Sequence, residues 1–135
     1  YSSIMRIMDT SGMCMLQWTS APQMDMAKII SAALGREVSM QDLMKIGERI
    51  SHIRQAFNAR EGIDPQSRKM SSGRPVGVPP LGAGPTANVT VDAESMRANY
   101  FKGMGWDLKT GKPSRERLMA LGLDDVAQDL WPASV

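Results

Sequence analysis

The sequence predicts an all-α fold, an irregular helical domain that carries one long loop rich in glycine and proline. Apolar residues recur at spacings of three and four along residues 43–57, which is the period of one face of an α-helix. Residues 71–85 contain four glycines and four prolines, so neither a helix nor a central strand can form there. Alternation with period two extends no further than residues 88–91, and no substantial strand is predicted.

The longest predicted helix contains residues 43–57. Ser39 followed by Asp42 resembles a capping box at its start, while Gly62 ends it and Pro65 prevents it from resuming. We expect one apolar face to be buried along its length, formed by Leu43, Ile46, Ile50, Ile53 and Phe57. Two charged groups have spacings suited to ion pairs within the helix, so we expect them on a solvated or inter-domain face: Lys45, Glu48 and Arg49, and the run of residues 54–60.

Shorter helices are predicted on both sides of this long helix, each from a start or stop signal. Before the long helix, we predict the end of a helix at residues 3–8, a turn at residues 9–12, and a helix with Pro22 in its first turn and Gly35 at its end. After the loop, we predict a helix from Asp92 to Gly103, a turn at residues 107–111 and a helix from Ser114 to Gly122. A last helical turn contains Val126 and Leu130. No internal repeat is present.

Composition excludes several classes of protein. The chain has 135 residues, 42% of them hydrophobic, and a net charge of +2, which argues against a strongly basic nucleic-acid surface. No apolar run approaches the roughly 18 residues of a membrane span. One cysteine excludes an internal disulfide. We therefore expect a cytoplasmic chain without a membrane span or a nucleic-acid partner. Because it starts at Tyr1, we also expect it to be a piece of a longer protein.

His52 is the only histidine, and it lies near the edge of the predicted apolar face. Imidazole can bind a metal or transfer a proton, but no Ser, Cys or carboxylate stands in an obvious relation to this residue. The sequence therefore predicts a surface or boundary histidine without a catalytic role.

Cys14 has two interpretations that its spacing leaves open. A free cysteine beside Met13 and Met15 is typical of a small buried hydrophobic residue. Alternatively, the turn at residues 9–12 presents the thiol to a metal cluster that is held mainly by another part of the protein. In that case Asp9, five residues earlier, can accept hydrogen bonds from the edge of a ligand on the same side.

Three segments together resemble the C-terminal portion of the tungsten-containing aldehyde:ferredoxin oxidoreductase family. Residues 9–14, Asp-Thr-Ser-Gly-Met-Cys, resemble its D-x-x-G-L-C motif, with Met13 in place of Leu. Residues 42–50 and 57–62 resemble its long helix and the F-N-x-R-E-G ending of that helix. Residues 100–123 contain G-W-D, G-x-P and L-x-x-L-G-L in the family's order. The resemblance implies that residues 1–135 form the C-terminal helical domain, or part of it, of a larger multidomain enzyme, with residues 66–91 as an extended loop over a neighbouring domain.

The resemblance assigns roles to three residues. Cys14 matches the fourth ligand of a 4Fe-4S cluster, whose other three cysteines, spaced C-x2-C-x3-C, lie far upstream in the family. Asp9 matches the aspartate that hydrogen-bonds one of the two pterins holding tungsten (or molybdenum), and Met13 matches a main-chain contact to the same pterin. The family's catalytic residues also lie upstream, so we expect this fragment alone to be inactive and to hold neither metal nor pterin.

The implied activity is the oxidation of aldehydes to carboxylic acids, with electrons leaving through the 4Fe-4S cluster to ferredoxin. The implied partners are ferredoxin and the upstream domains of the same chain, and a second copy in a homodimer is a further candidate. Residues 65–68 depart from the family's archaeal pattern, and residues 84–92 look more like bacterial relatives. A benzoyl-coenzyme A reductase-type subunit of the same superfamily is therefore an alternative. A stand-alone helical interaction module is the other.

Overall fold

The computed structural model describes residues 2–21, 24–65 and 73–132, which form seven α-helices and one 3-10 helix. The helices are α1 (Ser2–Ser11), α2 (Met15–Ser20), α3 (Met26–Leu34), α4 (Met40–Arg60), η1 (Arg74–Val76), α5 (Ala93–Met104), α6 (Arg115–Ala120) and α7 (Asp124–Leu130). Among these residues, β-structure is limited to two isolated bridges, Leu81 with Ala87 and Trp106 with Pro113. The predicted all-α fold is confirmed.

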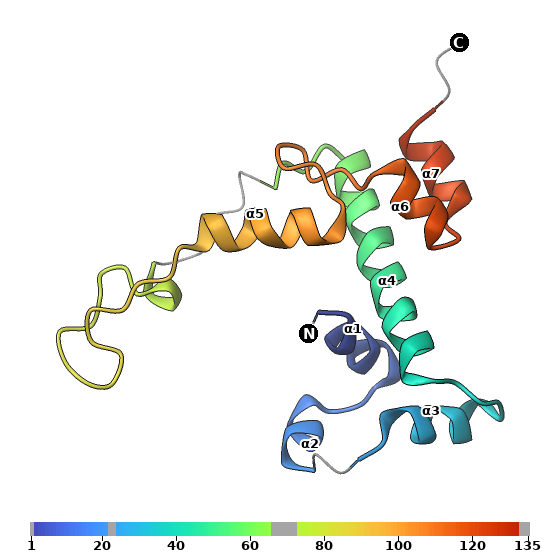
Figure 1. The fold of residues 1–135 in the computed structure, drawn as a ribbon, viewed down its shortest axis with the longest axis horizontal. Helices are drawn as coiled ribbons and strands as arrows, with labels where there is room; N and C mark the ends of the chain where they lie inside the picture. The colour runs from blue at the N-terminus through green and yellow to red at the C-terminus, as the bar shows by residue number, and fades with distance from the viewer. Residues whose placement is uncertain (1, 22–23, 66–72, 133–135) are drawn as a thin grey trace.

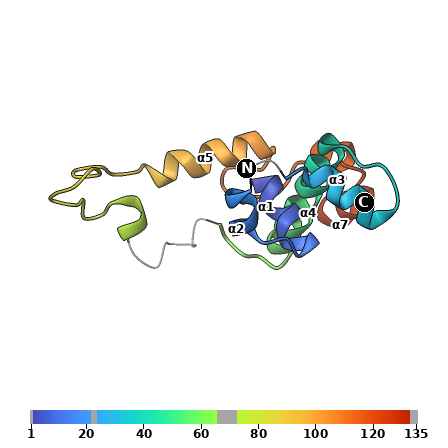
Figure 2. The same cartoon turned by 90° about the horizontal axis from the view of Figure 1, so that it is seen from below.

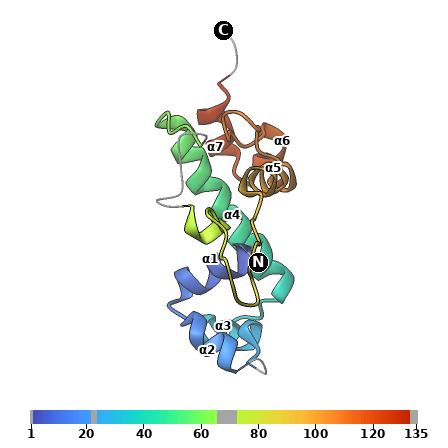
Figure 3. The same cartoon turned by 90° about the vertical axis from the view of Figure 1, so that its left-hand side faces the viewer.

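Helix α4 is the central element, and it joins two separate hydrophobic cores. Helices α1 to α3 lie at its N-terminal end, and α6 and α7 lie at its C-terminal end (Figures 1 and 3). The first core consists of Ile7, Met8, Met26, Val38 and Leu43. The second core consists of Ala56, Leu118, Leu121, Leu123, Ala127 and Leu130. Each end of the chain thus packs against a different part of the same helix.

The start of α4 follows from two residues, as predicted. The Ser39 hydroxyl oxygen accepts a hydrogen bond from the Asp42 backbone N–H at 3.1 Å, and Asp42 Oδ2 accepts one from the Ser39 N–H at 3.0 Å. This reciprocal capping box satisfies two amides that the helix itself leaves unpaired. Hydrogen bonds from the Ser39 hydroxyl and N–H lower the pKa of the Asp42 carboxyl.

The predicted buried face of α4 is wrong for most of its length. The buried residues are Leu43, Gly47, Ser51, His52 and Ala56. Three members of the predicted face, Ile46, Ile53 and Phe57, are instead 38%, 44% and 54% exposed. The physical reason is close packing, because small residues allow a neighbouring backbone to approach the helix more closely than large ones. At Gly47, an added Cβ would overlap the carbonyl oxygen of Ser3 in α1.

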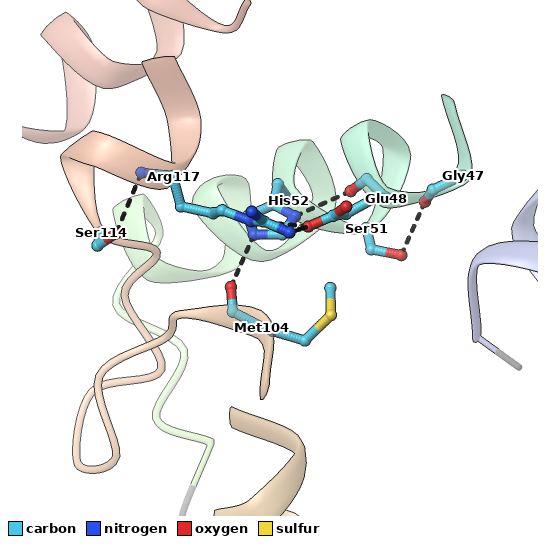
Figure 4. Close-up of polar contacts among 7 residues, drawn as sticks. All are labelled: Gly47, Glu48, Ser51, His52, Met104, Ser114 and Arg117. Atoms are coloured by element: carbon cyan, nitrogen blue, oxygen red, sulfur yellow. Dashed lines mark hydrogen bonds and ion pairs between the residues drawn. The ribbon is translucent and has the colours of Figure 1, made fainter. Parts of the chain in front are cut away.

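The charged residues of α4 bind other helices rather than one another. The Glu48 carboxylate accepts a hydrogen bond from Arg117 Nε in α6 at 2.8 Å (Figure 4). Arg49 Nη1 donates to the carbonyl oxygens of Leu121 and, at 3.2 Å, Gly122, just beyond the end of α6. Arg60 pairs with its neighbour Glu61 and with Asp129 of α7. Lys45, Arg54 and Arg60 are exposed, in agreement with a solvated face. The expected ion pairs within the helix are absent among the described residues, and Glu48, Arg49 and Arg60 instead attach the last two helices.

Several predicted boundaries also shift. Residues 9–11 form the last turn of α1, rather than a separate turn, and residues 15–20 form a helix that was not predicted. Asp25 caps α3, so the helix starts at Met26, and Pro22 lies outside the described residues. Helix α5 ends at Gly105 rather than Gly103. Four boundaries are as predicted: the N-caps at Ser39, Asp92 and Ser114, and the end of α3 at Gly35.

The described part of the glycine- and proline-rich loop extends beyond the N-terminal end of α5, away from both cores (Figures 1 and 2). Residues 66–72 of the predicted loop lie outside the described residues. Between residues 73 and 91 the backbone makes its own hydrogen bonds, including Val78 N–H to Gly73 oxygen at 2.9 Å and Val91 N–H to Val76 oxygen at 2.8 Å. Glycine and proline thus limit this segment to turns and one 3-10 helix but do not prevent local order.

The molecule exposes more surface than a compact protein of its mass. Its accessible surface is 9497 Å², whereas a folded monomer of 14.8 kDa exposes about 7,000 Å². The exposed residues of α4 and the projecting loop contribute to this excess of about 2,500 Å². Among the described helices, none combines the length and the apolar character needed to cross a bilayer.

Candidate functional site

The three residues predicted to bind cofactors lie at the junction of α1 and α2. Helix α1 ends at Gly12, whose φ of +73° is in the left-handed region that glycine adopts without strain. The N–H of Met13 then donates to the Met8 carbonyl at 3.2 Å, the bond that defines a Schellman ending. The Asp-x-x-Gly-x-Cys segment thereby closes one helix at Gly12 and places Cys14 directly before the next helix, which starts at Met15.

Cys14 is exposed and forms the N-cap of α2 with extended backbone angles. Its carbonyl accepts a backbone hydrogen bond from Trp18 at 3.2 Å, and the residue is not part of the core at this end of α4. The interpretation of Cys14 as a buried hydrophobic residue is therefore wrong. Within the described ranges, no group of three or more His, Cys, Asp or Glu residues could hold a metal ion.

Asp9 is exposed on the last turn of α1. Its Oδ2 accepts a hydrogen bond from Arg6 Nη1 at 3.3 Å, one turn earlier. Oδ1 makes no hydrogen bond to any described residue and remains available to a donor on a ligand. An exposed pair at this spacing contributes about 0–1 kcal/mol to stability, so Asp9 is not needed to hold the helix.

Met13 is half-buried, and its side chain packs on the core that contains Met8 and Leu43. Because its N–H already donates to Met8, a main-chain contact to a ligand would use its carbonyl oxygen. Asp9, Met13 and Cys14 thus share one helix junction, although no hydrogen bond joins them to one another in the described chain.

His52 is completely buried, so its prediction as a surface or boundary residue is wrong. Nδ1 lies 2.9 Å from the Glu48 carbonyl oxygen, and Nε2 lies 3.0 Å from the Met104 carbonyl oxygen at the end of α5 (Figure 4). The ring also meets Trp106 edge to face, with 5.7 Å between centroids. His52 therefore connects α4 to the end of α5.

We expect His52→Ala to destabilise the protein by about 3 kcal/mol, because it leaves a cavity at a fully buried position and removes the contact between Nε2 and the Met104 carbonyl. His52→Phe keeps most of the ring volume and removes only the polar contacts of the ring nitrogens, so its expected loss is smaller, about 1–2 kcal/mol. The measurement is the free energy of unfolding in urea. A loss below about 0.5 kcal/mol in His52→Ala, the size typical of surface changes, would contradict this assignment.

A pocket lies at the C-terminal end of α4. It has a volume of about 480 Å³, and its walls include Ala59, Ile63, Lys109 and Leu130. Asp9 and Cys14 belong to the opposite end of the chain, whose core contains Leu43 near the start of α4. Most of the length of a 21-residue helix, about 30 Å, separates the two regions. The pocket and the predicted cofactor residues are thus different places.

A family model and individual relatives both match this chain to aldehyde ferredoxin oxidoreductases. Residues 1–123 match the family described as "Aldehyde ferredoxin oxidoreductase, domains 2 & 3". The chain is 30% identical over 123 residues to the tungsten-containing aldehyde ferredoxin oxidoreductase of Pyrococcus furiosus, covering 91% of this chain and 20% of that protein. It is 29% identical over 123 residues to the same enzyme of Thermococcus kodakarensis, with the same coverage. No solved structure matches the chain.

The match extends over almost all of the described helices, from α1 to the residue before α7. The chain spans about a fifth of the length of the curated relatives that it matches. By this match, the chain belongs to the aldehyde ferredoxin oxidoreductase family.

Proposed function

We propose that the chain forms the C-terminal helical part of an oxidoreductase that oxidises aldehydes to carboxylic acids and delivers the electrons to ferredoxin. The observation that carries the proposal is the family match over residues 1–123, in which the named relatives are tungsten-containing aldehyde ferredoxin oxidoreductases. The placement of Cys14 on the surface adds support, because a ligand to a group shared with another part of the protein must be accessible.

In this proposal, Cys14 is one thiolate ligand of a 4Fe-4S cluster. Such a cluster takes four cysteine thiolates and, when bound, supplies one-electron transfer. The exposed thiol between two helices fits the role of one ligand, and the other three would come from a part of the protein outside this chain. The Schellman ending at Gly12 and the start of α2 fix the backbone on both sides of Cys14, which holds the thiol in one place.

Asp9 and Met13 would orient one of the pterins that hold tungsten (or molybdenum). The Asp9 Oδ1 atom can accept a hydrogen bond from an amide-like or guanidine-like edge, and the Met13 carbonyl oxygen can accept another. Outer contacts of this kind orient a cofactor and tune its electronic properties, while the redox chemistry belongs to the cofactor.

The exposed apolar face of α4 supports the proposal that this chain is part of a larger protein. Ile46, Ile53 and Phe57 lie on one helix face and are each exposed by a third or more, and the molecule has about 2,500 Å² of surplus surface. Upstream domains of the same polypeptide would cover this face, with ferredoxin as the electron acceptor and a second copy as a possible partner. An interaction module that works alone would instead have to bind an unrelated protein there.

The test uses the full-length protein, purified without oxygen and supplied with ferredoxin. We expect aldehydes to drive the reduction of ferredoxin, and benzoyl-coenzyme A to be left unchanged in the presence of reduced ferredoxin. Reduction of the aromatic ring without aldehyde oxidation would instead favour the benzoyl-coenzyme A reductase-type subunit. If neither reaction occurs in protein that contains tungsten and iron, the proposed substrate class is wrong.

A further inference from the structure

The segment that projects beyond the N-terminal end of α5, residues 73–91, carries almost no charge. Arg74 is the one charged residue among its 19, whereas 22% of the whole chain is charged. None of these residues is buried, and none belongs to either hydrophobic core. Charged residues are depleted where two protein surfaces meet, so this composition is typical of an interface. We call residues 73–91 the arm.

The arm also exposes four large apolar side chains. Val78, Leu81 and Val89 are 56%, 52% and 51% exposed, and Val91 is 42% exposed. Single apolar residues are common on a protein surface, but several on one projecting segment mark a site of contact with another protein surface. Composition and exposure thus both indicate that the arm is covered in the assembled protein.

The shape of the arm is set by its own backbone. The Asn88 N–H donates to the Leu81 carbonyl at 2.9 Å, and Leu81 and Ala87 form an isolated bridge. Gly77 has a φ of +75°, and an added Cβ there would overlap the Val89 carbonyl oxygen. The two sides of the arm therefore lie as close together as their backbones allow. A segment that is already ordered loses little conformational entropy when it binds, which favours docking as a rigid unit.

We propose that the arm docks on an apolar surface of the upstream part of the same polypeptide. The chain spans about a fifth of the length of its curated relatives, so in a protein of that length most of the polypeptide lies outside residues 1–135. Helix α1 and the arm lie on the same side of α4, so residues that precede α1 would enter on that side (Figures 1 and 2). The covalent connection also keeps the upstream part at a high effective concentration near the arm.

Ferredoxin suits the arm less well than the upstream part does. Partners that bind and leave are recognised largely through complementary charge, and the arm offers a single arginine. The inference rests on the proposed membership of the chain in a longer polypeptide. It does not rest on aldehyde oxidation, because its measurements use neither an aldehyde nor an electron acceptor.

The experiment replaces Leu81 by p-benzoylphenylalanine in the full-length protein, and ultraviolet light then crosslinks this side chain to the surface that it touches. We expect a product with the mass of a single chain, in which the peptide around position 81 is joined to a peptide upstream of residue 1. Val89 is the second position, in case one substitution prevents folding. Arg115, an exposed charged residue of α6, is the control position and should give several times less product.

A second measurement compares Leu81→Asp with Leu81→Met in the full-length protein. If the arm is covered, the aspartate carboxylate loses its hydration, whereas methionine keeps the apolar contacts. We expect Leu81→Asp to lower the midpoint of thermal unfolding by about 2 °C or more, and Leu81→Met to leave it unchanged.

The proposal is overturned by a crosslinked product of twice the mass of the chain, which would identify a second copy, or by a product that forms only after ferredoxin is added. It is also overturned if positions 81 and 89 give no more product than position 115, or if Leu81→Asp and Leu81→Met unfold at the same temperature. A protein that fails to oxidise aldehydes would still form the crosslink, so the two failures are distinguishable.

Discussion

Replacement of Cys14 by serine in the full-length protein is expected to remove most of its aldehyde-dependent reduction of ferredoxin. A serine oxygen is a weaker ligand than a thiolate, so the proposed 4Fe-4S cluster should lose iron or shift its reduction potential. The fold should remain intact, because Cys14 is exposed and substitutions at such positions usually change stability by less than about 0.5 kcal/mol. The measurements are iron content, the EPR signal of the reduced cluster and the rate of ferredoxin reduction.

Asp9→Ala is the matched comparison at the same helix junction. It removes an exposed carboxylate whose described contact is a single hydrogen bond from Arg6. We expect this variant to keep its iron and its EPR signal while the pterin content or the turnover falls. If Cys14→Ser retained normal iron, EPR and turnover, Cys14 would be an ordinary surface residue and its proposed role would be wrong.

The helix boundaries that could be predicted are those set by local chemistry. A Ser or Asp side chain that accepts a hydrogen bond from an amide three residues later needs no distant contact, and this is what Ser39, Asp92 and Ser114 do. The left-handed glycine at Gly35 is equally local. The short helix at residues 15–20 was missed because it has no side-chain cap and too few residues to show a period.

The buried face of α4 could not be predicted because it depends on which helices pack against it. Apolar periodicity marks Ile46, Ile53 and Phe57, yet the structure buries Gly47, Ser51 and His52 instead. The periodic pattern is typical of a face that contacts another part of a protein, and in the described residues that face is exposed. Where α1 crosses α4, the small size of the Gly47 side chain, rather than its hydrophobicity, allows the two helices to pack closely.

The assignment of Asp9, Met13 and Cys14 as cofactor contacts stays a prediction, which came from the family resemblance. The structure adds that these residues share the junction between two helices and that Cys14 is exposed. Whether Cys14 was buried depended on how α1 and α2 pack, which the spacing alone does not determine. His52 was missed because its two carbonyl partners include Met104, which lies 52 residues away in the sequence.

Gly47→Ala is expected to lower the free energy of unfolding by about 2–3 kcal/mol, although alanine favours a helix. A Cβ at this position would overlap the backbone carbonyl of Ser3, so α1 would have to move away from α4. Overpacking of this kind typically costs about 1–3 kcal/mol, and a backbone neighbour cannot rotate away as a side chain can. The measurement is unfolding in urea, monitored by circular dichroism.

Gly103→Ala is the control that separates packing from helix propensity. Gly103 lies in α5, and a Cβ there would meet no other atom within 4 Å. Alanine should therefore stabilise the protein at this position, by up to about 1 kcal/mol. The two substitutions are chemically identical, so changes of opposite sign in the free energy of unfolding would establish the close crossing of α1 and α4.

Because α1 leads directly into the junction with Asp9 and Cys14, a displacement of α1 should also disturb the proposed cofactor contacts. Equal stabilisation by both substitutions would mean that α1 does not pack on Gly47, and the position of that junction would be wrong with it.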